Sequence, residues 1–213
     1  MGKVIYKNLF RIYKSHLQNA EYQDARNTLL KIKEINPAKG WYHQGLLYPR
    51  LATKRASRRD VFSKQVGYFK KSLSYNGKDP SAWRALGNAY FQLKKYDLAE
   101  RAYRQSLKFS RSELYKNDAL RFIADILIVR GELKKALAIL NKVFRSKHRP
   151  PYIQLASHFV SYYQKVGNQE MVNHWAKKAI LSAKIIEKSG KPAYGPKDIY
   201  QKVIRDFEGF IKG

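Results

Sequence analysis

The segment between residues 80 and 111 constrains the fold of this chain more than any other part of the sequence. Its first half carries an apolar stripe at spacings of three and four residues, formed by Trp83, Leu86, Gly87 and Tyr90. Its second half carries another stripe, formed by Tyr96, Ala99, Tyr103, Ser106 and Leu107. Because such spacings place side chains on one face of an α-helix, the segment is predicted to form two amphipathic helices joined by a tight turn.

The motif W-x2-L-G-x2-Y, followed by Ala99 and the aromatic Tyr103, resembles the tetratricopeptide repeat (TPR), a helical hairpin with a period of about 34 residues. Two positions depart from the family pattern: Ser106 stands for its usual second alanine and Arg111 for its closing proline. The small residues Gly87 and Ala99 are expected to let the two helices approach closely. Since one hairpin cannot bury its apolar face alone, about three or more are needed, and related hairpins are expected elsewhere in the chain.

The same spacing, followed in both directions, accounts for most of the chain with five hairpins. They are expected at residues 3–37, 38–79, 80–111, 117–150 and 152–188. A last amphipathic helix is expected to start near Asp198. The sequence therefore predicts an all-α fold, a TPR-like αα-hairpin solenoid of about five repeats over residues 1–188, with a C-terminal capping helix at residues 196–213.

Residues 49–60 interrupt the second hairpin, which is roughly eight residues longer than the repeat period. Pro49 is expected to end the preceding helix, because proline has no N–H and its ring clashes with the preceding turn. The basic side chains of this insertion are Arg50, Lys54, Arg55, Arg58 and Arg59. Guanidinium groups match phosphates with two parallel hydrogen bonds, so the insertion is a candidate polyanion contact. The alternative is a solvated connection between two helices.

The charge of the chain supports the same interpretation. The formal net charge is +27. The excess is spread over the chain, with +5, +7, +5, +5 and +5 in residues 1–40, 41–79, 80–116, 117–152 and 153–213. Solubility alone asks for a net charge of only about 2–8, and a nearby polyanion would relieve the self-repulsion of the fold. A lysine-rich bias of the lineage is the alternative explanation.

Exposed positions of the second helices are expected to form basic ridges, which contact phosphates without distinguishing base sequence. The candidate polyanion-binding residues of these ridges are Arg101, Arg104, Lys108, Lys134, Lys135, Lys142, Arg145, Lys177, Lys178 and Lys184.

The resemblance to the TPR family implies a concave groove lined by the first helices of successive repeats. The corresponding positions in this chain are Tyr42, Arg84, Asn88, Phe91, Arg121 and Asp125, with Ser157 and Gln164 in the fifth hairpin. Arg84 with Asn88 resembles half of the family's clamp for a C-terminal carboxylate, whereas the other half is missing. Arg84 and Arg121 are expected to point into one concavity. Asp125 is expected to pair with Arg121 when no ligand is bound.

The sequence contains no motif of a familiar enzyme class. A Gly-rich phosphate loop, H-E-x-x-H and G-x-S-x-G are all absent from it. Cysteine is absent as well, and the five histidines show no metal-ligand spacing, so neither a metal nor another cofactor is expected. No apolar run reaches the roughly 18 residues of a membrane span, and no signal peptide is recognised. A non-catalytic cytoplasmic protein is therefore expected.

These observations predict an adaptor that docks on a nucleoprotein assembly through its basic surface, with RNA or DNA as the polyanion, and that holds a protein partner in its groove. Two alternatives stay open at this point. One is a protein–protein scaffold that binds an acidic protein or peptide, and the other is a structural subunit of a larger particle.

Overall fold

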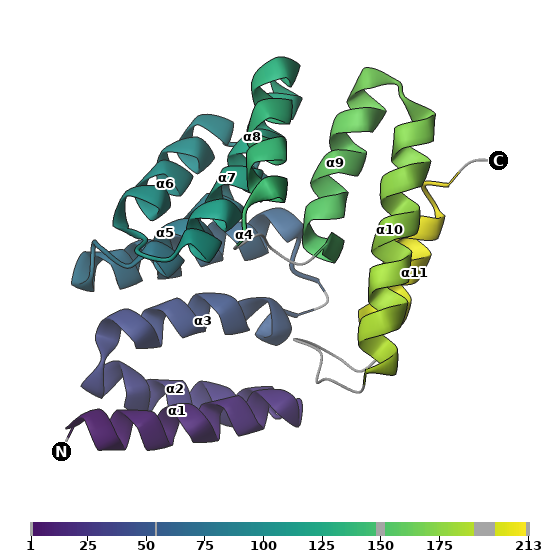
Figure 1. Ribbon diagram of the computed structural model, residues 1–213. Helices are drawn as coiled ribbons and strands as arrows, with labels where there is room; N and C mark the ends of the chain where they lie inside the picture. The colour runs from purple at the N-terminus through teal and green to yellow at the C-terminus, as the bar shows by residue number, and fades with distance from the viewer. Residues whose placement is uncertain (1, 54, 148–151, 190–198, 212–213) are drawn as a thin grey trace. The chain divides into compact units, whose positions relative to one another are not determined.

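The computed structural model describes residues 2–53, 55–147, 152–189 and 199–211. Over these residues the chain forms eleven α-helices and no strand, which confirms the predicted all-α fold. The helices cluster into two compact units, residues 1–110 and 111–213, which are described separately below (Figure 1). None of the described helices has both the length and the hydropathy needed to cross a membrane.

The first unit consists of three helical hairpins (Figure 1). They pair α1 (Gly2–Gln18) with α2 (Tyr22–Ile35), α3 (Pro37–Leu51) with α4 (Arg58–Tyr75), and α5 (Pro80–Gln92) with α6 (Tyr96–Phe109). Neighbouring hairpins contact each other through α2 with α3 and through α4 with α5. The unit therefore has the sequential packing expected of a solenoid, in which each repeat contacts its neighbours.

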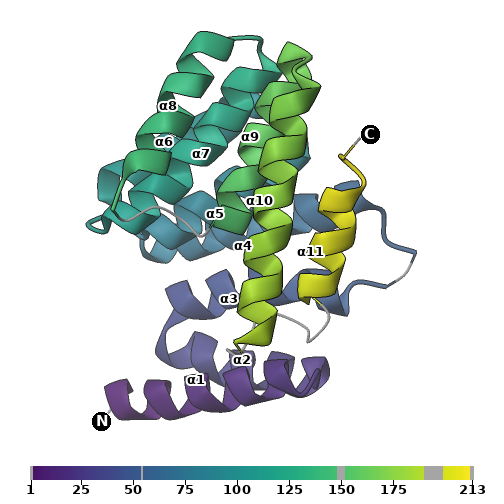
Figure 2. The ribbon, with the colours of Figure 1, turned by 45° about the vertical axis from the view of Figure 1, so that its right-hand side comes forward.

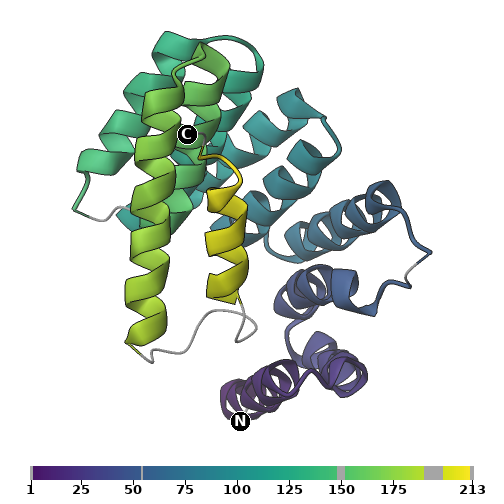
Figure 3. The same cartoon turned by 90° about the vertical axis from the view of Figure 1, so that its right-hand side faces the viewer.

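The second unit holds two further hairpins and a final helix. These are α7 (Glu113–Val129) with α8 (Leu133–Arg145), α9 (Tyr152–Val166) with α10 (Gln169–Lys188), and α11 (Ile199–Glu208). Figures 2 and 3 show α11 lying along α10, and Ile204 and Phe207 are its buried side chains. This is the packing expected of a capping helix. The boundary proposed between residues 188 and 196 stays a prediction, and Asp198 lies outside the described residues.

Two of the first helices start with the same capping device. Asn36 and Asp79 precede Pro37 and Pro80, and their side chains accept hydrogen bonds from backbone N–H groups of the first turn, at 3.1 Å and 2.9 Å. A capping side chain satisfies a backbone donor that has no partner within the helix, and proline at the first helical position removes another such donor. These boundaries are therefore determined locally by the sequence.

The close approach of α5 and α6 was expected from Gly87 and is confirmed. A Cβ atom added to Gly87 would lie 2.6 Å from a ring atom of Tyr103, so no larger residue fits without displacement. Gly45 has the same relation to Phe69 at the crossing of α3 and α4, with a nearest distance of 2.5 Å. Two hairpins thus pack a glycine of the first helix against an aromatic ring of the second.

Ser106, which departs from the family alanine, joins the two helices of its hairpin. Its buried hydroxyl donates a hydrogen bond to the carbonyl of Pro80 at 2.8 Å. Ser72 does the same with the carbonyl of Ala38 at 2.7 Å. The serine therefore replaces an apolar contact by a buried hydrogen bond between the helices, repeated in two hairpins.

The expectation that Pro49 ends its helix is wrong by two residues, because α3 continues to Leu51. Proline cannot donate the hydrogen bond that residue 49 would make to the carbonyl of Gly45, one turn earlier. The side chain of Gln65 on α4 donates to that carbonyl instead, at 2.8 Å. A tertiary contact thus compensates for the missing donor, and the helix continues for about half a turn beyond Pro49.

Only part of the predicted insertion lies between the two helices. Residues 49–51 belong to α3, residues 58–60 belong to α4, and only residues 52–57 connect the two helices. Ser57 caps α4 by accepting a hydrogen bond from the backbone N–H of Asp60 at 3.1 Å. Part of the extra length is therefore used to extend helices.

Candidate functional site

The candidate basic residues of the second helices are all exposed. Two of them have acidic partners close by in the sequence: Arg104 pairs with Glu100 on α6 at 2.6 Å, and Lys135 pairs with Glu132, the residue before α8, at 2.7 Å. Within the described part of the chain, the other eight have no carboxylate within ion-pair distance. This set therefore carries positive charge that the described residues leave uncompensated, in both units.

The basic residues of the insertion do not form one patch on a loop. Arg50 lies in the last turn of α3, Arg55 in the connection, and Arg58 and Arg59 in the first turn of α4. All four are exposed, whereas Lys54 lies outside the described residues. Cations in the first turn of a helix face the positive end of its dipole. An anion bound near this turn would therefore be favoured by the helix and by both arginines.

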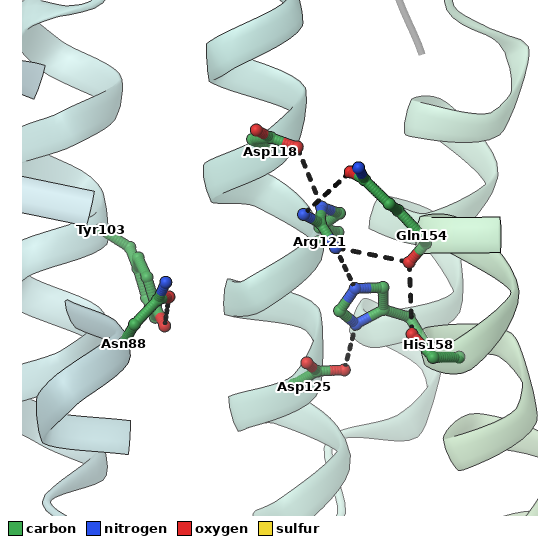
Figure 4. Close-up of polar contacts among 8 residues, drawn as sticks. Asn88, Tyr103, Asp118, Arg121, Asp125, Gln154 and His158 are labelled. Carbon is green, nitrogen blue, oxygen red and sulfur yellow. Dashed lines mark hydrogen bonds and ion pairs between the residues drawn. The ribbon is translucent and has the colours of Figure 1, made fainter. Parts of the chain in front are cut away.

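On α5, the predicted groove residues Arg84, Asn88 and Phe91 are half-buried. The side-chain oxygen of Asn88 accepts a hydrogen bond from the hydroxyl of Tyr103 at 2.7 Å, which fixes the amide plane (Figure 4). Phe91 packs edge-on against Tyr96, with ring centroids 5.5 Å apart. Neither the guanidinium of Arg84 nor the amide nitrogen of Asn88 bonds another described residue. The two donors can thus serve a ligand.

Tyr42 and its neighbour His43 lie beside an aromatic cluster of the first unit. The His43 ring contacts Phe10, Tyr13 and Tyr42, with centroids 4.8, 5.4 and 4.9 Å away. Burial, together with the positive charge of Lys39, lowers the pKa of His43 to about 4. His43 is therefore neutral at physiological pH and packs as an aromatic ring.

The expected ion pair between Arg121 and Asp125 is wrong, because His158 lies between them (Figure 4). Arg121 Nη1 is 2.7 Å from His158 Nε2, and His158 Nδ1 is 2.6 Å from Asp125 Oδ1. Arginine only donates hydrogen bonds, so Nε2 accepts and the proton lies on Nδ1, facing the carboxylate. Arg121 also pairs with Asp118 at 3.0 Å and is only 8% exposed.

This network links α7 to α9 and occupies positions expected to line a groove. Its charged groups are already bonded within the chain, so a ligand would have to displace buried hydrogen bonds. Ligand binding by Arg121 and Asp125 stays a prediction. Since Arg84 and Arg121 belong to different units, their expected meeting in one concavity also stays a prediction. The sequence did not single out His158, because its partners lie 33 and 37 residues away.

One cluster of possible metal ligands is found among the described residues, at the turn between α1 and α2. The ligand atoms of His16, Glu21 and Asp24 lie within 4.8 Å of one another. His16 Nδ1 and Glu21 Oε2 are 2.6 Å apart, and this hydrogen bond lowers the pKa of the Glu21 carboxyl. The cluster is therefore explained by a hydrogen bond at a helix start.

The fold defines the class of this protein as a helical-hairpin repeat protein. The family model of the tetratricopeptide repeat matches residues 80–112. Superkiller protein 3 of Schizosaccharomyces pombe is 28% identical over 138 residues, which cover 64% of this chain and 9% of that protein. The chain thus spans less than a tenth of the length of this curated relative.

Solved structures share this fold over most of the chain. PilW, a widely conserved type IV pilus biogenesis factor, is 12% identical with a TM-score of 0.67, covering 96% of this chain and 91% of its own. YrrB, a TPR protein with an unusual peptide-binding site, is 17% identical with a TM-score of 0.54, covering 82% and 84%. Residues 80–112 thus match the tetratricopeptide repeat, and the chain has the fold of solved TPR proteins.

Proposed function

We propose that this chain is a non-catalytic TPR scaffold, which docks on a nucleoprotein assembly through its basic surface and holds a protein partner against its first helices. The observation that carries the proposal is the uncompensated charge of the second helices. Eight exposed cations on α6, α8 and α10 have no carboxylate partner among the described residues, in a chain of net charge +27. Evenly spread cations of this kind suit the phosphates of a nucleic acid.

The protein-binding part of the proposal rests on α5. Arg84 and Asn88 are one helical turn apart and offer donors on the same face, and Phe91 adds an apolar surface beside them. Such a face suits an extended segment with a carboxylate and an apolar side chain. YrrB, which has the same fold, is described as a peptide-binding protein, and this agrees with the proposal.

Salt dependence tests the nucleic-acid contact. Binding of a labelled RNA and of a DNA duplex is measured by fluorescence anisotropy at increasing salt. If about six phosphates are neutralised, affinity falls roughly a thousandfold between about 50 and 200 mM salt, with little preference for sequence. A charge-reversal variant carries glutamate at the basic positions of the insertion, which are Arg50, Lys54, Arg55, Arg58 and Arg59. Its affinity for nucleic acid is expected to fall less steeply as the salt concentration rises.

Unchanged binding in that variant would indicate that the ridges of the second helices make the contact instead of the insertion. An absence of binding at low salt would reject the nucleic-acid contact and favour a scaffold for an acidic protein. Circular dichroism and thermal melting of each variant show whether the fold is retained.

Capture of a protein partner tests the face of α5. The double variant Arg84→Ala and Asn88→Ala is expected to weaken capture about tenfold or more after nuclease treatment, because charge-assisted hydrogen bonds contribute about 1.5–3 kcal/mol each. Nucleic-acid binding is expected to stay nearly intact. Tyr103→Phe is the matched control, since it removes the same hydrogen bond to Asn88 and leaves both donors in place. Equal recovery by the double variant and wild type would remove this face from the mechanism.

A further inference from the structure

A pocket of about 400 Å³ opens in the first unit between α2, α3 and α4. Its wall includes the cationic side chains of Arg26 and Lys33, the amide of Gln44, and the stacked rings of Trp41 and Tyr68, whose centroids are 6.0 Å apart. None of its lining residues is acidic. The pocket therefore presents two positive charges without a counter-ion.

Comparison of the hairpins with one another shows that two polar residues of this pocket replace leucines. When the motifs W-x3-G-x2-Y are aligned, Gln44 takes the place of Leu86, which is 3% exposed in the third hairpin. When the second helices are aligned on their apolar stripes, Lys33 takes the place of Leu73 and Leu107. Among the first three hairpins, one core position of the repeat is therefore polar only in the first, at Lys33 of α2, and another only in the second, at Gln44 of α3.

The two replacements contact each other. Lys33 Nζ donates a hydrogen bond to Gln44 Oε1 at 3.2 Å and lies 4.1 Å from the centre of the Trp41 ring. No carboxylate among the described residues lies within ion-pair distance of Lys33 or Arg26. Burial lowers the pKa of Lys33, and the nearby charge of Arg26 lowers it further. An ammonium group in these surroundings is stabilised by any anion that enters the pocket.

We propose that this pocket binds an acidic side chain of the protein partner, with an adjacent apolar side chain packed on its rim. The proposal rests on the scaffold function proposed above and identifies a second contact, separate from the face of α5. The carboxylate would bond Lys33 and Arg26, while Leu30 and Leu51, which also line the pocket, would contact the apolar neighbour. Leu30 is 51% exposed, so it offers apolar area that the chain itself does not bury.

A peptide fits these surroundings better than a nucleotide. The Trp41 ring is already engaged by Tyr68 and by the Lys33 ammonium, so it is a poor platform for a stacked base. The leucines add nothing to the recognition of a phosphodiester. A glutamate or aspartate beside a large apolar residue uses both the charges and the apolar rim.

The test uses a fluorescein-labelled peptide with one Leu-Glu-Leu segment in a glycine–serine sequence, and a counterpart with glutamine for glutamate. Binding to the full chain is measured by anisotropy at about 150 mM salt, where unpaired surface charges are largely screened. The variant Lys33→Leu with Gln44→Leu installs the residues of the other hairpins, so it is expected to melt at or above the wild-type temperature. Lys31→Leu is the control, since it removes one exposed charge from the same helix.

The glutamate peptide is expected to bind about tenfold or more tightly than the glutamine peptide, and to lose about that factor in the Leu variant. Lys31→Leu is expected to change binding less than about twofold. Equal binding of the two peptides, an undiminished affinity in the Leu variant, or an equal loss in Lys31→Leu would overturn the proposal. The proposal would also be overturned if a single-stranded RNA lost affinity for the Leu variant while the glutamate peptide did not. Arg84 and Asn88 are intact throughout, so failure here is distinct from failure of the face of α5.

Discussion

Replacement of Gly87 by alanine tests the packing that holds each hairpin together. The added Cβ would lie 2.6, 2.7 and 3.0 Å from three ring atoms of Tyr103. The Tyr103 ring is 0% exposed, and its hydroxyl is held by Asn88 at 2.7 Å, so it has little freedom to move away. One methyl group is therefore enough to force the two helices apart or to push the ring out of its rotamer.

Two effects of opposite sign determine the size of the change. Alanine favours the helix over glycine by about 1 kcal/mol. Overpacking in a close-packed core costs about 1–3 kcal/mol, and these short contacts put Gly87 in the upper part of that range. We therefore expect a net destabilisation of about 1–2 kcal/mol for Gly87→Ala, and more for Gly87→Leu.

Urea unfolding followed by circular dichroism measures the change. Gly67→Ala is the matched control, since Gly67 lies within α4 and its added Cβ meets nothing within 4 Å, so a gain of up to about 1 kcal/mol is expected there. Adding Tyr103→Leu to Gly87→Ala should recover part of the loss, because the first hairpin combines Tyr13 with Leu29 at the equivalent positions. If Gly87→Ala is as stable as wild type, the close-approach argument fails.

Three further predictions concern the first unit. The pKa of His43 is lowered to about 4, so the unfolded chain binds a proton at this histidine at a higher pH than the folded chain does. The free energy of unfolding should therefore fall by up to about 3 kcal/mol as the pH drops from 6.5 to 4. His43→Phe should flatten this loss, whereas His174→Gln should not. Lys94→Gly should stabilise by about 1 kcal/mol in urea unfolding, since Lys94 has φ 59° at the turn of its hairpin. Asp79→Asn should cost about 1–2 kcal/mol in the same assay, by weakening the 2.6 Å ion pair with Lys39, and an unchanged midpoint would show that this pair contributes nothing.

Most of the helical architecture was predictable because its causes are local. The stripe of Trp83, Leu86, Gly87 and Tyr90 determines one face of α5. The pairs Asn36–Pro37 and Asp79–Pro80 determine where two helices begin. The prediction failed at Pro49, where the rule that proline ends a helix was overridden by the side chain of Gln65 on another helix. A local rule gives the cost of a missing donor, and it contains no information about a distant amide that replaces the donor.

The candidate sites were less predictable for the same reason. Lys33 on α2 appeared in the sequence as one basic residue among 43, and Gln44 as an ordinary polar residue. Their hydrogen bond exists only because α2 and α3 pack at that point. The sequence by itself determined the hairpins, their caps and the excess of positive charge, since these depend on spacing and composition. The tertiary structure decided which charges are paired and which remain available, because that depends on which helix faces each side chain after packing.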